Sequence, residues 1–306
     1  MSIGIGNSHG KIILMGEHSV VYGKPAIAIP FPSVGIIATV TPHPEELMIS
    51  CEFYQGLVSE MPELLESLRH VITISLDYLN KNETLSIGIQ STIPAERGMG
   101  SSAAVAVATV RGIFDYFEVS LTNELLLSIV GESEKIAHGN PSGLDALMTS
   151  STTPYFFAKN QFMTPFSLNL DACLIVADTG ITGQTKAAVA EIASKQHQKE
   201  VSEMISRLGE LAEASKIYIT NNQPLDLGKA MIASHQLLAK LNVSNDCLDQ
   251  LVKVALNNGA IGAKLTGGGR GGCMIALATS KQEAQHIQKA LTSHGAKNTW
   301  LYQMGD

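Results

Sequence analysis

The chain has 306 residues, of which 45% are hydrophobic and 16% charged, as is ordinary for a globular protein with a large core. Its net charge of -7 argues against nucleic acid as a partner, because a protein that binds a phosphate backbone needs a basic surface. The sequence contains no run of about 18 apolar residues, and MSIGIGNSHGK lacks the apolar stretch of a signal peptide, so we expect a cytoplasmic protein that does not enter a membrane. The four cysteines form no CxxC pair, which favours neither a zinc site nor a disulfide framework, and we expect buried thiols.

The first half of the chain favours a sheet followed by helices. Four segments rich in isoleucine and valine are typical of strands: KIILMG (11–16), AIAIPF (26–31), VGIIATVTP (34–42) and LSIGIQSTI (85–93). Apolar spacing predicts helices over 62–78, 101–117 and 122–138. The second of these is apolar nearly all round apart from Arg111 and Asp115, which indicates a buried helix.

The second half mixes strands and helices without regular alternation, which favours an α+β fold over a doubly wound sheet. CLIVAD (173–178) and TWLYQ (299–303) predict strands, and KLTGGGRGGCMIALA (264–278) predicts a glycine loop that runs into a strand. Amphipathic patterns predict helices over 184–219, 225–241 and 246–257. Ser280 and Glu283 form a capping-box pattern for one more helix.

The segment GMGSSAA (98–104) places glycines and serines directly before the buried helix. Glycines allow a ligand to approach the backbone, and the unpaired N–H groups at a helix start attract anions. Alone, the pattern is explained better by a turn in which Ser101 caps the helix, because serine is a favoured cap in any protein. It is not a Walker loop, because no lysine follows the glycines, and it is not a Rossmann fingerprint, because a serine stands in place of the third glycine.

Two further segments accompany this one. GKIILMGEHSVVYGKPA (10–26) contains Lys11, Glu17 and His18 around a strand that ends in glycine. KLTGGGRGG (264–272) is a second glycine-rich turn. Each alone is commonly a strand end or a plain loop, but their joint occurrence favours a site for a phosphorylated ligand.

The sequence resembles the kinase superfamily named for galactokinase, homoserine kinase, mevalonate kinase and phosphomevalonate kinase. Four segments carry the resemblance in the order of the family: GKIILMGEHSVVYGKPAIAIP, PAERGMGSSAAVAVA, EKIAHGNPSGLDA and KLTGGGRGGCMIAL. The first and third are similar specifically to the mevalonate kinases of compact bacterial type. The resemblance implies a two-domain α+β small-molecule kinase fold, with an N-terminal ribosomal-protein-S5-like kinase domain (1–168) and a C-terminal ferredoxin-like α/β domain (169–306).

The resemblance implies ATP-dependent phosphorylation of the primary hydroxyl of mevalonate. The residues that it implies for the nucleotide phosphates are Arg97, Gly98, Met99, Gly100, Ser101, Ser102 and Ala103. It implies that Ser102 and Glu134 bind Mg²⁺, a hard cation that prefers oxygen ligands. Without the resemblance, Glu134 is equally well explained as a surface carboxylate paired with a lysine.

Asp145 matches the catalytic aspartate of the family, and Lys11 matches its partner lysine. An aspartate can accept the hydroxyl proton, while a nearby ammonium group stabilises both oxygens. From the residues alone, Asp145 is equally well explained as a residue that caps or solvates a helix beginning after Pro141 and Ser142. The resemblance favours the catalytic role of Asp145 over the capping role.

Glu17, His18 and Thr185 are implied to line the pocket of the acceptor, with His18 donating to mevalonate. The loop 267–272 is expected to close over the site, and the role of Arg270 stays open because many relatives have glycine there. Ser8-His9 stands where relatives often have Ala-Pro, and we expect only a changed start of the strand.

The alternatives are a sister kinase of phosphomevalonate, galactose or homoserine, and a silent homologue that senses nucleotide. The run GEHSVVYGKPA differs from the GEHTD-like run of sugar kinases, and Lys11, Ser102, Glu134 and Asp145 are all retained. We expect mevalonate and ATP as small-molecule partners, no nucleic acid and no membrane. The resemblance also implies a homodimer.

Overall fold

The computed structural model describes residues 3–138, 142–159 and 161–305, and it divides the chain into two compact units. The first unit contains Met1–Lys11, Pro30–Ala95 and Gly100–Thr152, and the second contains Ile12–Ile29, Glu96–Met99 and Thr153–Asp306. Each unit is therefore built from separate segments of the chain. The division into domains 1–168 and 169–306 stays a prediction.

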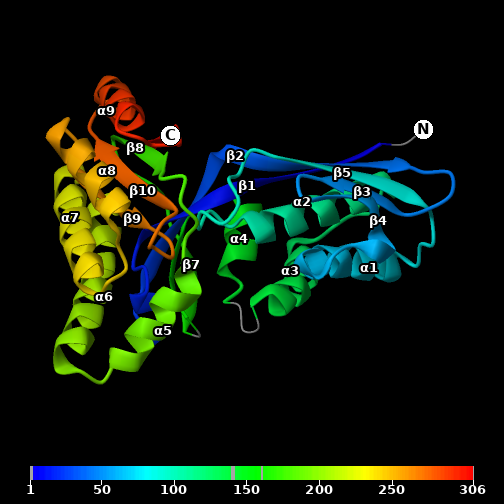
Figure 1. Cartoon of the computed structure of the whole chain (residues 1–306), viewed down its shortest axis with the longest axis horizontal. Coiled ribbons are helices and arrows are strands. Elements are labelled where there is room, and N and C mark those ends of the chain that lie inside the picture. Colours follow the sequence, from blue (N-terminus) through cyan, green and yellow to red (C-terminus); the bar gives the residue numbers. More distant parts are fainter. Residues whose placement is uncertain (1–2, 139–141, 160, 306) are drawn as a thin grey trace. The chain divides into compact units, whose positions relative to one another are not determined.

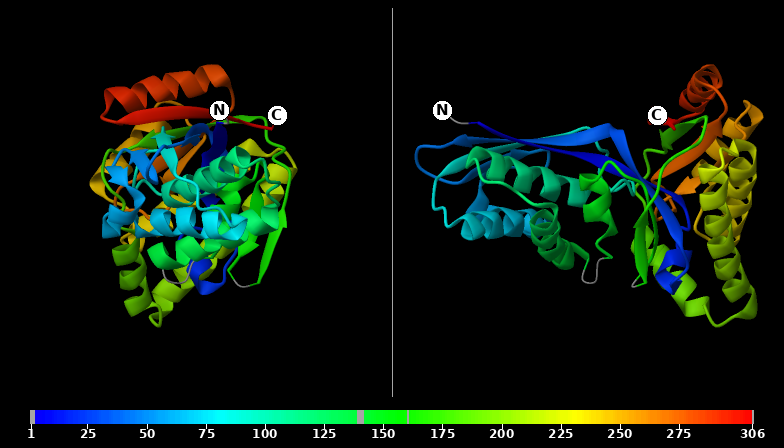
Figure 2. Two further views of the ribbon diagram at one scale, coloured as in Figure 1. Left: turned by 90° about the vertical axis from the view of Figure 1, so that its right-hand side faces the viewer. Right: turned by 180° about the vertical axis from the view of Figure 1, so that it is seen from behind.

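The first unit is a mixed sheet with helices on one face, as the ribbon views show (Figure 1, Figure 2). Its strands are parts of β1 (Gly4–Met15) and β2 (Ala26–Pro42), together with β3 (Met48–Cys51), β4 (Tyr54–Leu57) and β5 (Leu85–Ser91). β5 pairs antiparallel with β2 and parallel with β3, and β3 forms a hairpin with β4. The helices are α1 (Glu66–Leu79), α2 (Ser101–Tyr116), α3 (Asn123–His138) and α4 (Leu144–Ser150).

Helix α2 forms the centre of the first unit. Small and apolar side chains on it are buried, including Ala104, Ala108 and Phe114. One hydrophobic cluster joins its residue Ile113 to α1, β3 and β5, and another joins its residue Val110 to α1, α3 and α4. The prediction of a buried helix here is confirmed.

The second unit contains a four-stranded antiparallel sheet in the described part of the chain, with the order β11-β8-β10-β9. Its strands are β8 (Ala172–Asp178), β9 (Gly262–Thr266), β10 (Cys273–Ala278) and β11 (Asn298–Met304). Helices α5 (Thr185–Lys195), α6 (Lys199–Thr220), α7 (Pro224–Lys240) and α8 (Asp246–Asn257) lie between β8 and β9 in sequence, and α9 (Lys281–Ser293) lies between β10 and β11. This strand order with helical crossovers is that of a ferredoxin-like fold, as expected.

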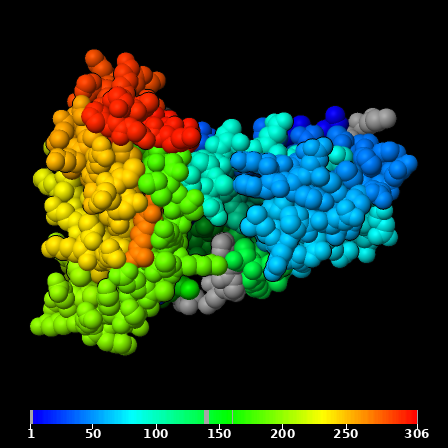
Figure 3. All heavy atoms as spheres, viewed as in Figure 1, coloured from blue at the N-terminus to red at the C-terminus, as the bar shows by residue number. Residues whose placement is uncertain are grey.

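The helices of the second unit form much of its surface in the space-filling view, from α9 in red to α6 in green (Figure 3). Two short strands, β6 (Tyr155–Ala158) and β7 (Phe162–Pro165), extend the sheet from the beginning of β2. Ser280 caps α9 by accepting a hydrogen bond from the backbone N–H of Glu283 at 3.2 Å, which confirms the capping prediction. In the part of the chain that the structure describes, no helix is both long and apolar enough to cross a bilayer.

Four features differ from the sequence-based expectation. The segments 26–31 and 34–42, predicted as two strands, form the single strand β2 (Ala26–Pro42). The predicted helix over 184–219 is two helices, because the backbone is extended at Gln198 (φ -71°, ψ 131°). The first strand begins at Gly4 rather than at Lys11. Among the cysteines, Cys173 and Cys273 are buried, but Cys51 and Cys247 are only partly so.

Candidate active site

The first candidate feature is the beginning of α2. Gly98 and Gly100 have φ values of +77° and +76°, a left-handed conformation that disfavours other residues. Gly100 is the N-cap and Ser101 is the first helical residue, so Ser101 is not the cap. Within the described ranges no side chain caps this helix. The N–H groups of its first turn have no partners within the helix and can bind an anion.

Lys11 lies next to this helix start. A Cβ atom at Gly100 would be 3.0 Å from Cγ of Lys11 and 3.1 Å from Cγ2 of Thr149. Glycine is thus required here for close approach as well as for its backbone conformation. The side chains of Met99 and Ala103 are buried, so only their backbones can contribute to phosphate binding.

Lys11 also forms an ion pair with Asp145, with 3.2 Å between Nζ and Oδ1. Lys11 comes from β1 and Asp145 from the first turn of α4, whose N-cap is Gly143. The side chain of Lys11 is 8% exposed and that of Asp145 is 37% exposed, so the carboxylate can be reached by a ligand. Pro141, which entered the alternative explanation of Asp145, lies outside the described residues. The structure therefore brings together the two predicted catalytic residues.

Glu134 is a buried carboxylate on α3, with 4% exposure. Burial and the negative charge of Asp145 together raise its pKa to about 7, against the opposing positive charge of Lys11. The neighbouring Lys135 pairs with Glu132 at 2.7 Å instead of Glu134. Burial and the negative charge of Asp145 both disfavour the ionised form of Glu134, and a bound divalent cation would stabilise that form.

The residues proposed for Mg²⁺ fit the group. The hydroxyl of Ser102 is exposed at the start of α2, and Glu134 supplies one carboxylate. Mg²⁺ usually takes one or two carboxylates, completing its shell with water and substrate phosphates. Among the described residues there is no cluster of three or more His, Cys, Asp or Glu that could hold a metal ion, so a site made only of protein ligands is not indicated.

In the second unit, Glu17 pairs with Lys264, and both side chains are almost fully buried. Burial lowers the pKa of Lys264, and the charge of Glu17 opposes this. Nζ of Lys264 also donates to the backbone oxygen of Leu265 at 2.6 Å. The two residues are far apart in sequence, and although Lys264 begins the glycine-rich motif, nothing in the pattern indicated its partner.

His18 contacts the glycine loop of the same unit. Its Nε2 lies 3.0 Å from the backbone oxygen of Gly268, and because a carbonyl can only accept, Nε2 carries the proton. Burial, opposed by the hydrogen bond to Gly268 and assisted by the positive charges of Arg270 and Lys264, lowers the pKa of His18 to about 4. The ring is therefore neutral near pH 7 and Nδ1 is an acceptor. Nδ1 is buried and has no hydrogen-bond partner among the residues that the structure describes.

Thr185 is the first residue of α5 and packs against the same loop. A Cβ atom at Gly268 would be 1.7 Å from Oγ1 of Thr185, so only glycine fits at that position. The structure thus places His18 and Thr185 around one glycine. That both contact an acceptor stays a prediction.

Arg97 donates to three groups of one loop in the second unit. Its guanidinium donates to Asp178 at 2.9 Å, to Thr182 at 3.2 Å and to the backbone oxygen of Gly180 at 3.0 Å. Asp178 is 1% exposed. These contacts give Arg97 a role in holding the glycine-serine loop, and its predicted contact with nucleotide stays a prediction.

Arg270, whose role the sequence left open, connects the second glycine loop to two helices. It pairs with Glu191 of α5, and its Nε donates to the backbone oxygen of Asn242 at 2.9 Å, directly after α7. Three hydrogen-bond partners, Lys195, Asn242 and Arg270, lower the pKa of Glu191 to about 2.

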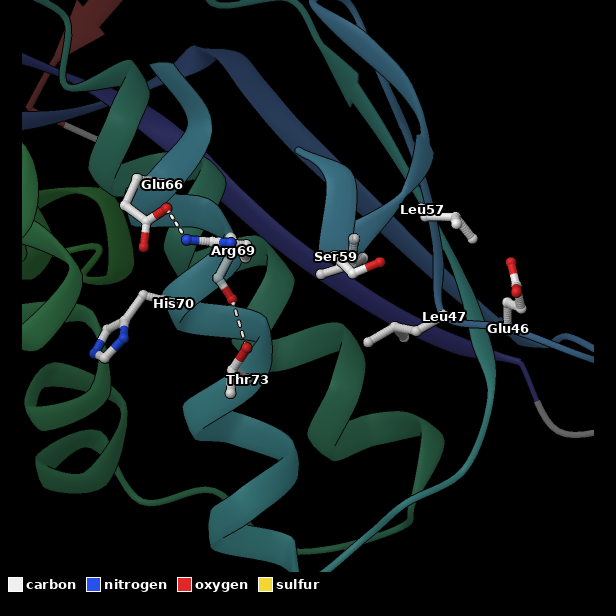
Figure 4. Close-up of a pocket in the computed structure, with 9 residues that line it drawn as sticks. Glu46, Leu47, Leu57, Ser59, Glu66, Arg69, His70 and Thr73 are labelled. Carbon is white, nitrogen blue, oxygen red and sulfur yellow. Dashed lines mark hydrogen bonds and ion pairs between the residues drawn. The ribbon is translucent and has the colours of Figure 1, made fainter. Parts of the chain in front are cut away.

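A pocket of about 640 Å³ lies in the first unit and was not predicted from the sequence (Figure 4). Residues of α1 form one wall, and residues 46–47 and 57–59 form the rest; those of α1 are Glu66, Arg69, His70 and Thr73. Glu66 and Arg69 point toward each other as an ion pair in the close-up. The hydroxyl of Ser133, the residue before Glu134, donates to the backbone oxygen of Ser67 at 2.9 Å, which connects α3 to this wall.

The fold, the Lys11–Asp145 pair beside the start of α2, and the residues around the second glycine loop are those of a small-molecule kinase. The chain matches the family described as GHMP kinases N terminal domain over residues 66–152 and GHMP kinases C terminal over residues 215–297. Together these matches span more than half of the chain, and the chain belongs to the GHMP kinases.

Within that superfamily, the chain belongs to the mevalonate kinase family. It is 34% identical to a mevalonate kinase of Pyrococcus abyssi over 304 residues, covering 91% of this chain and 89% of that protein. A crystal structure of mevalonate kinase from methicillin-resistant Staphylococcus aureus is 33% identical, with a TM-score of 0.79 and 100% of both chains covered. A crystal structure of L. major mevalonate kinase in complex with R-mevalonate is 25% identical, with a TM-score of 0.83, covering 99% and 96% of the two chains.

Proposed function

We propose that this chain transfers the γ-phosphoryl group of ATP to the primary hydroxyl of (R)-mevalonate, giving 5-phosphomevalonate and ADP in the mevalonate route to isoprenoids. ATP-dependent phosphorylation of mevalonate is the activity of the family to which the chain belongs. The observation that carries the proposal is the Lys11–Asp145 pair, next to the uncapped start of α2.

The reaction needs a group that orients the attacking alcohol and groups that hold the phosphates. Asp145 accepts a hydrogen bond from the hydroxyl of mevalonate and takes its proton as the new P–O bond forms. The bond between the γ-phosphorus and the bridging oxygen of ADP breaks in the same displacement. Lys11 stabilises the carboxylate before transfer and the alcohol oxygen as it loses its proton.

The first turn of α2 holds the donor phosphates through backbone N–H groups. Ser102 and Glu134 are the proposed protein ligands of Mg²⁺. When bound, Mg²⁺ neutralises negative charge on the phosphates of ATP. The pocket formed by α1 is the proposed site for the base and ribose of ATP, because α1 is hydrogen-bonded to α3 directly beside Glu134.

His18 and Thr185 are the proposed contacts of the acceptor, and Glu17 is proposed to lie beside them without contacting it. The hydrogen bond from Nε2 of His18 to Gly268 leaves Nδ1 as an acceptor, so this atom accepts from a mevalonate hydroxyl rather than donating. Glu17 is engaged by Lys264, and its contribution is therefore to position the residues around it.

The finer assignments are also proposals. The full-length match to the S. aureus structure supports the compact bacterial type, although the first relatives by sequence are archaeal. A homodimer is proposed from the family resemblance. A cytoplasmic location agrees with ATP as co-substrate and with four free cysteines.

A panel of acceptors in a coupled ADP assay tests the activity. We expect turnover with (R)-mevalonate and far less with phosphomevalonate, galactose or homoserine. Turnover with phosphomevalonate in preference to mevalonate would assign the sister activity. An enzyme that binds ATP but phosphorylates none of the four would support the silent homologue and overturn the proposal.

A further inference from the structure

Strand β1 packs against α2 with almost no side chains between the two backbones. A Cβ atom at Gly4 would be 2.2 Å from the backbone oxygen of Gly112, and one at Gly6 would be 1.9 Å from that of Ala108. The next inward residue, Ser8, donates from Oγ to the backbone oxygen of Ala104 at 2.7 Å. Alternate residues of the strand thus meet every fourth residue of the helix.

This pattern is geometrically consistent along both elements. Two strand residues advance about 6.6 Å, and four helical residues advance about 6 Å, so the contacts stay in step over several repeats. One repeat further, the positions are Gly10 in the strand and Gly100 at the start of the helix, and the side chain of Lys11, the residue after Gly10, lies beside Gly100. The register between β1 and α2 therefore determines where Lys11 lies relative to Ser101 and Ser102.

Two charged side chains of α2 fix this register. Oδ2 of Asp115 accepts from the backbone N–H of Ile5 at 2.8 Å, and NH1 of Arg111 donates to the backbone oxygen of Asn7 at 2.6 Å. These are the two residues that interrupt the otherwise apolar sequence of α2. A shift of β1 by one residue would break both contacts and place isoleucine where only glycine fits.

Arg111 has a second partner that connects it to the catalytic aspartate. Its NH2 donates to the backbone oxygen of Ser150 at 2.9 Å. Ser150 is the last residue of α4, where a cation is favourable to the helix dipole, and the first turn of this short helix carries Asp145. One guanidinium thus contacts both elements that carry the Lys11–Asp145 pair, and it belongs to the helix that carries the phosphate loop.

We propose that Arg111 is a positioning residue, which holds β1 and α4 against α2 and so sets Lys11 and Asp145 relative to the transferred phosphoryl group. This inference rests on the proposed function, because it concerns the geometry of that reaction. Arg111 contacts neither substrate in this account. Its effect is on the rate of transfer rather than on binding.

The test compares Arg111→Gln and Arg111→Lys with Arg207→Gln. Arg207 is an exposed residue of α6 that pairs only within its own helix, with Glu210 among the described residues. For Arg111→Gln we expect kcat to fall about 10- to 100-fold while KM for ATP and mevalonate changes less than about threefold, as for a small misplacement of reacting groups. Arg207→Gln retains the wild-type values. In an additional variant, Arg111→Ala, guanidinium at millimolar concentration partly restores kcat, and sodium chloride at equal ionic strength does not.

Hydrogen exchange separates this inference from the proposed function. Amides of the peptide 3–10 exchange faster in Arg111→Gln than in the wild type, and those of β11 do not change. If the wild type has no activity on mevalonate, the proposed function fails while the exchange result still tests the contact. Wild-type kcat in Arg111→Gln, a loss confined to KM, or unchanged exchange in 3–10 would each overturn the positioning role. If Arg111→Gln does not fold, Arg111→Lys, which loses the forked geometry but retains the charge, is measured by the same criteria.

Discussion

Replacing Gly100 by alanine tests the link between the proposed phosphate loop and Lys11, the proposed partner of the catalytic aspartate. Alanine in the left-handed conformation is strained by roughly 1–2 kcal/mol, since φ is +76° at this position. The new Cβ would also lie 3.0 Å from Cγ of Lys11, closer than ordinary contact, and the lysine side chain is only 8% exposed. Lys11 must therefore move by a few tenths of an ångström, away from its place beside Asp145.

Two other glycines provide matched controls for Gly100→Ala. Gly98 has nearly the same φ of +77°, but a Cβ there would meet nothing closer than 3.6 Å. Gly295, after α9, has a φ of +100° and no atom of a described residue within 4 Å of its added Cβ. All three alanine variants are strained, but only Gly100→Ala displaces Lys11.

We expect each alanine variant to lower the melting temperature by about 2–5 °C. Gly100→Ala should additionally lower kcat by about tenfold, in proportion to a misplacement smaller than 1 Å. Thermal unfolding and steady-state kinetics are measured on the same preparations. Equal kcat values for Gly295→Ala and Gly100→Ala, with equal stability, would refute the idea that Gly100 is needed to make room for the lysine.

Three further predictions concern the proposed catalytic aspartate, the proposed metal ligand and the pH dependence of stability. Asp145→Asn lowers kcat by roughly 10²- to 10⁴-fold while the affinity for ATP, measured by calorimetry, is nearly unchanged; full activity would remove Asp145 from its role. Glu134→Gln raises the Mg²⁺ concentration for half-maximal activity at least about tenfold, and an unaltered Mg²⁺ titration would exclude it as a ligand. His18 has a folded pKa of about 4, below its ordinary value of 6.5, so the unfolded chain binds its proton more readily and stability is lost as pH falls from 6.5 toward 4. Between pH 7 and pH 5 this loss of unfolding free energy is about 2 kcal/mol. Urea unfolding of His18→Asn should not show the loss, and asparagine tolerates the φ of 59° at this position. Parallel plots of unfolding free energy against pH for the two proteins would contradict the assignment.

The helices and most of the strands could be predicted from the spacing of apolar residues in the sequence. The buried nature of α2 was readable because its sequence is apolar on all sides, and α9 because Ser280 and Glu283 mark its start. The first residues of β1 were not readable as a strand. Gly4 and Gly6 have low strand propensity, and they are present because a helix backbone lies against them.

The individual site residues followed from motif resemblance, but their pairings did not. Nothing local indicates that Glu17 pairs with Lys264, since the partner lies in a distant strand. Arg111 and Asp115 were noticed only as polar exceptions on an apolar helix. The partners are the backbone N–H of Ile5 for Asp115 and backbone oxygens of β1 and α4 for Arg111, and such backbone groups leave no trace in the sequence.

A crystal of the protein with (R)-mevalonate and a nonhydrolysable ATP analogue tests the central claim most directly. We expect the terminal phosphate at the backbone N–H groups of Ser101 and Ser102, and the primary hydroxyl of mevalonate at about 3 Å from a carboxylate oxygen of Asp145. A terminal phosphate bound away from the start of α2, or a hydroxyl whose nearest acidic group is not Asp145, would contradict the account.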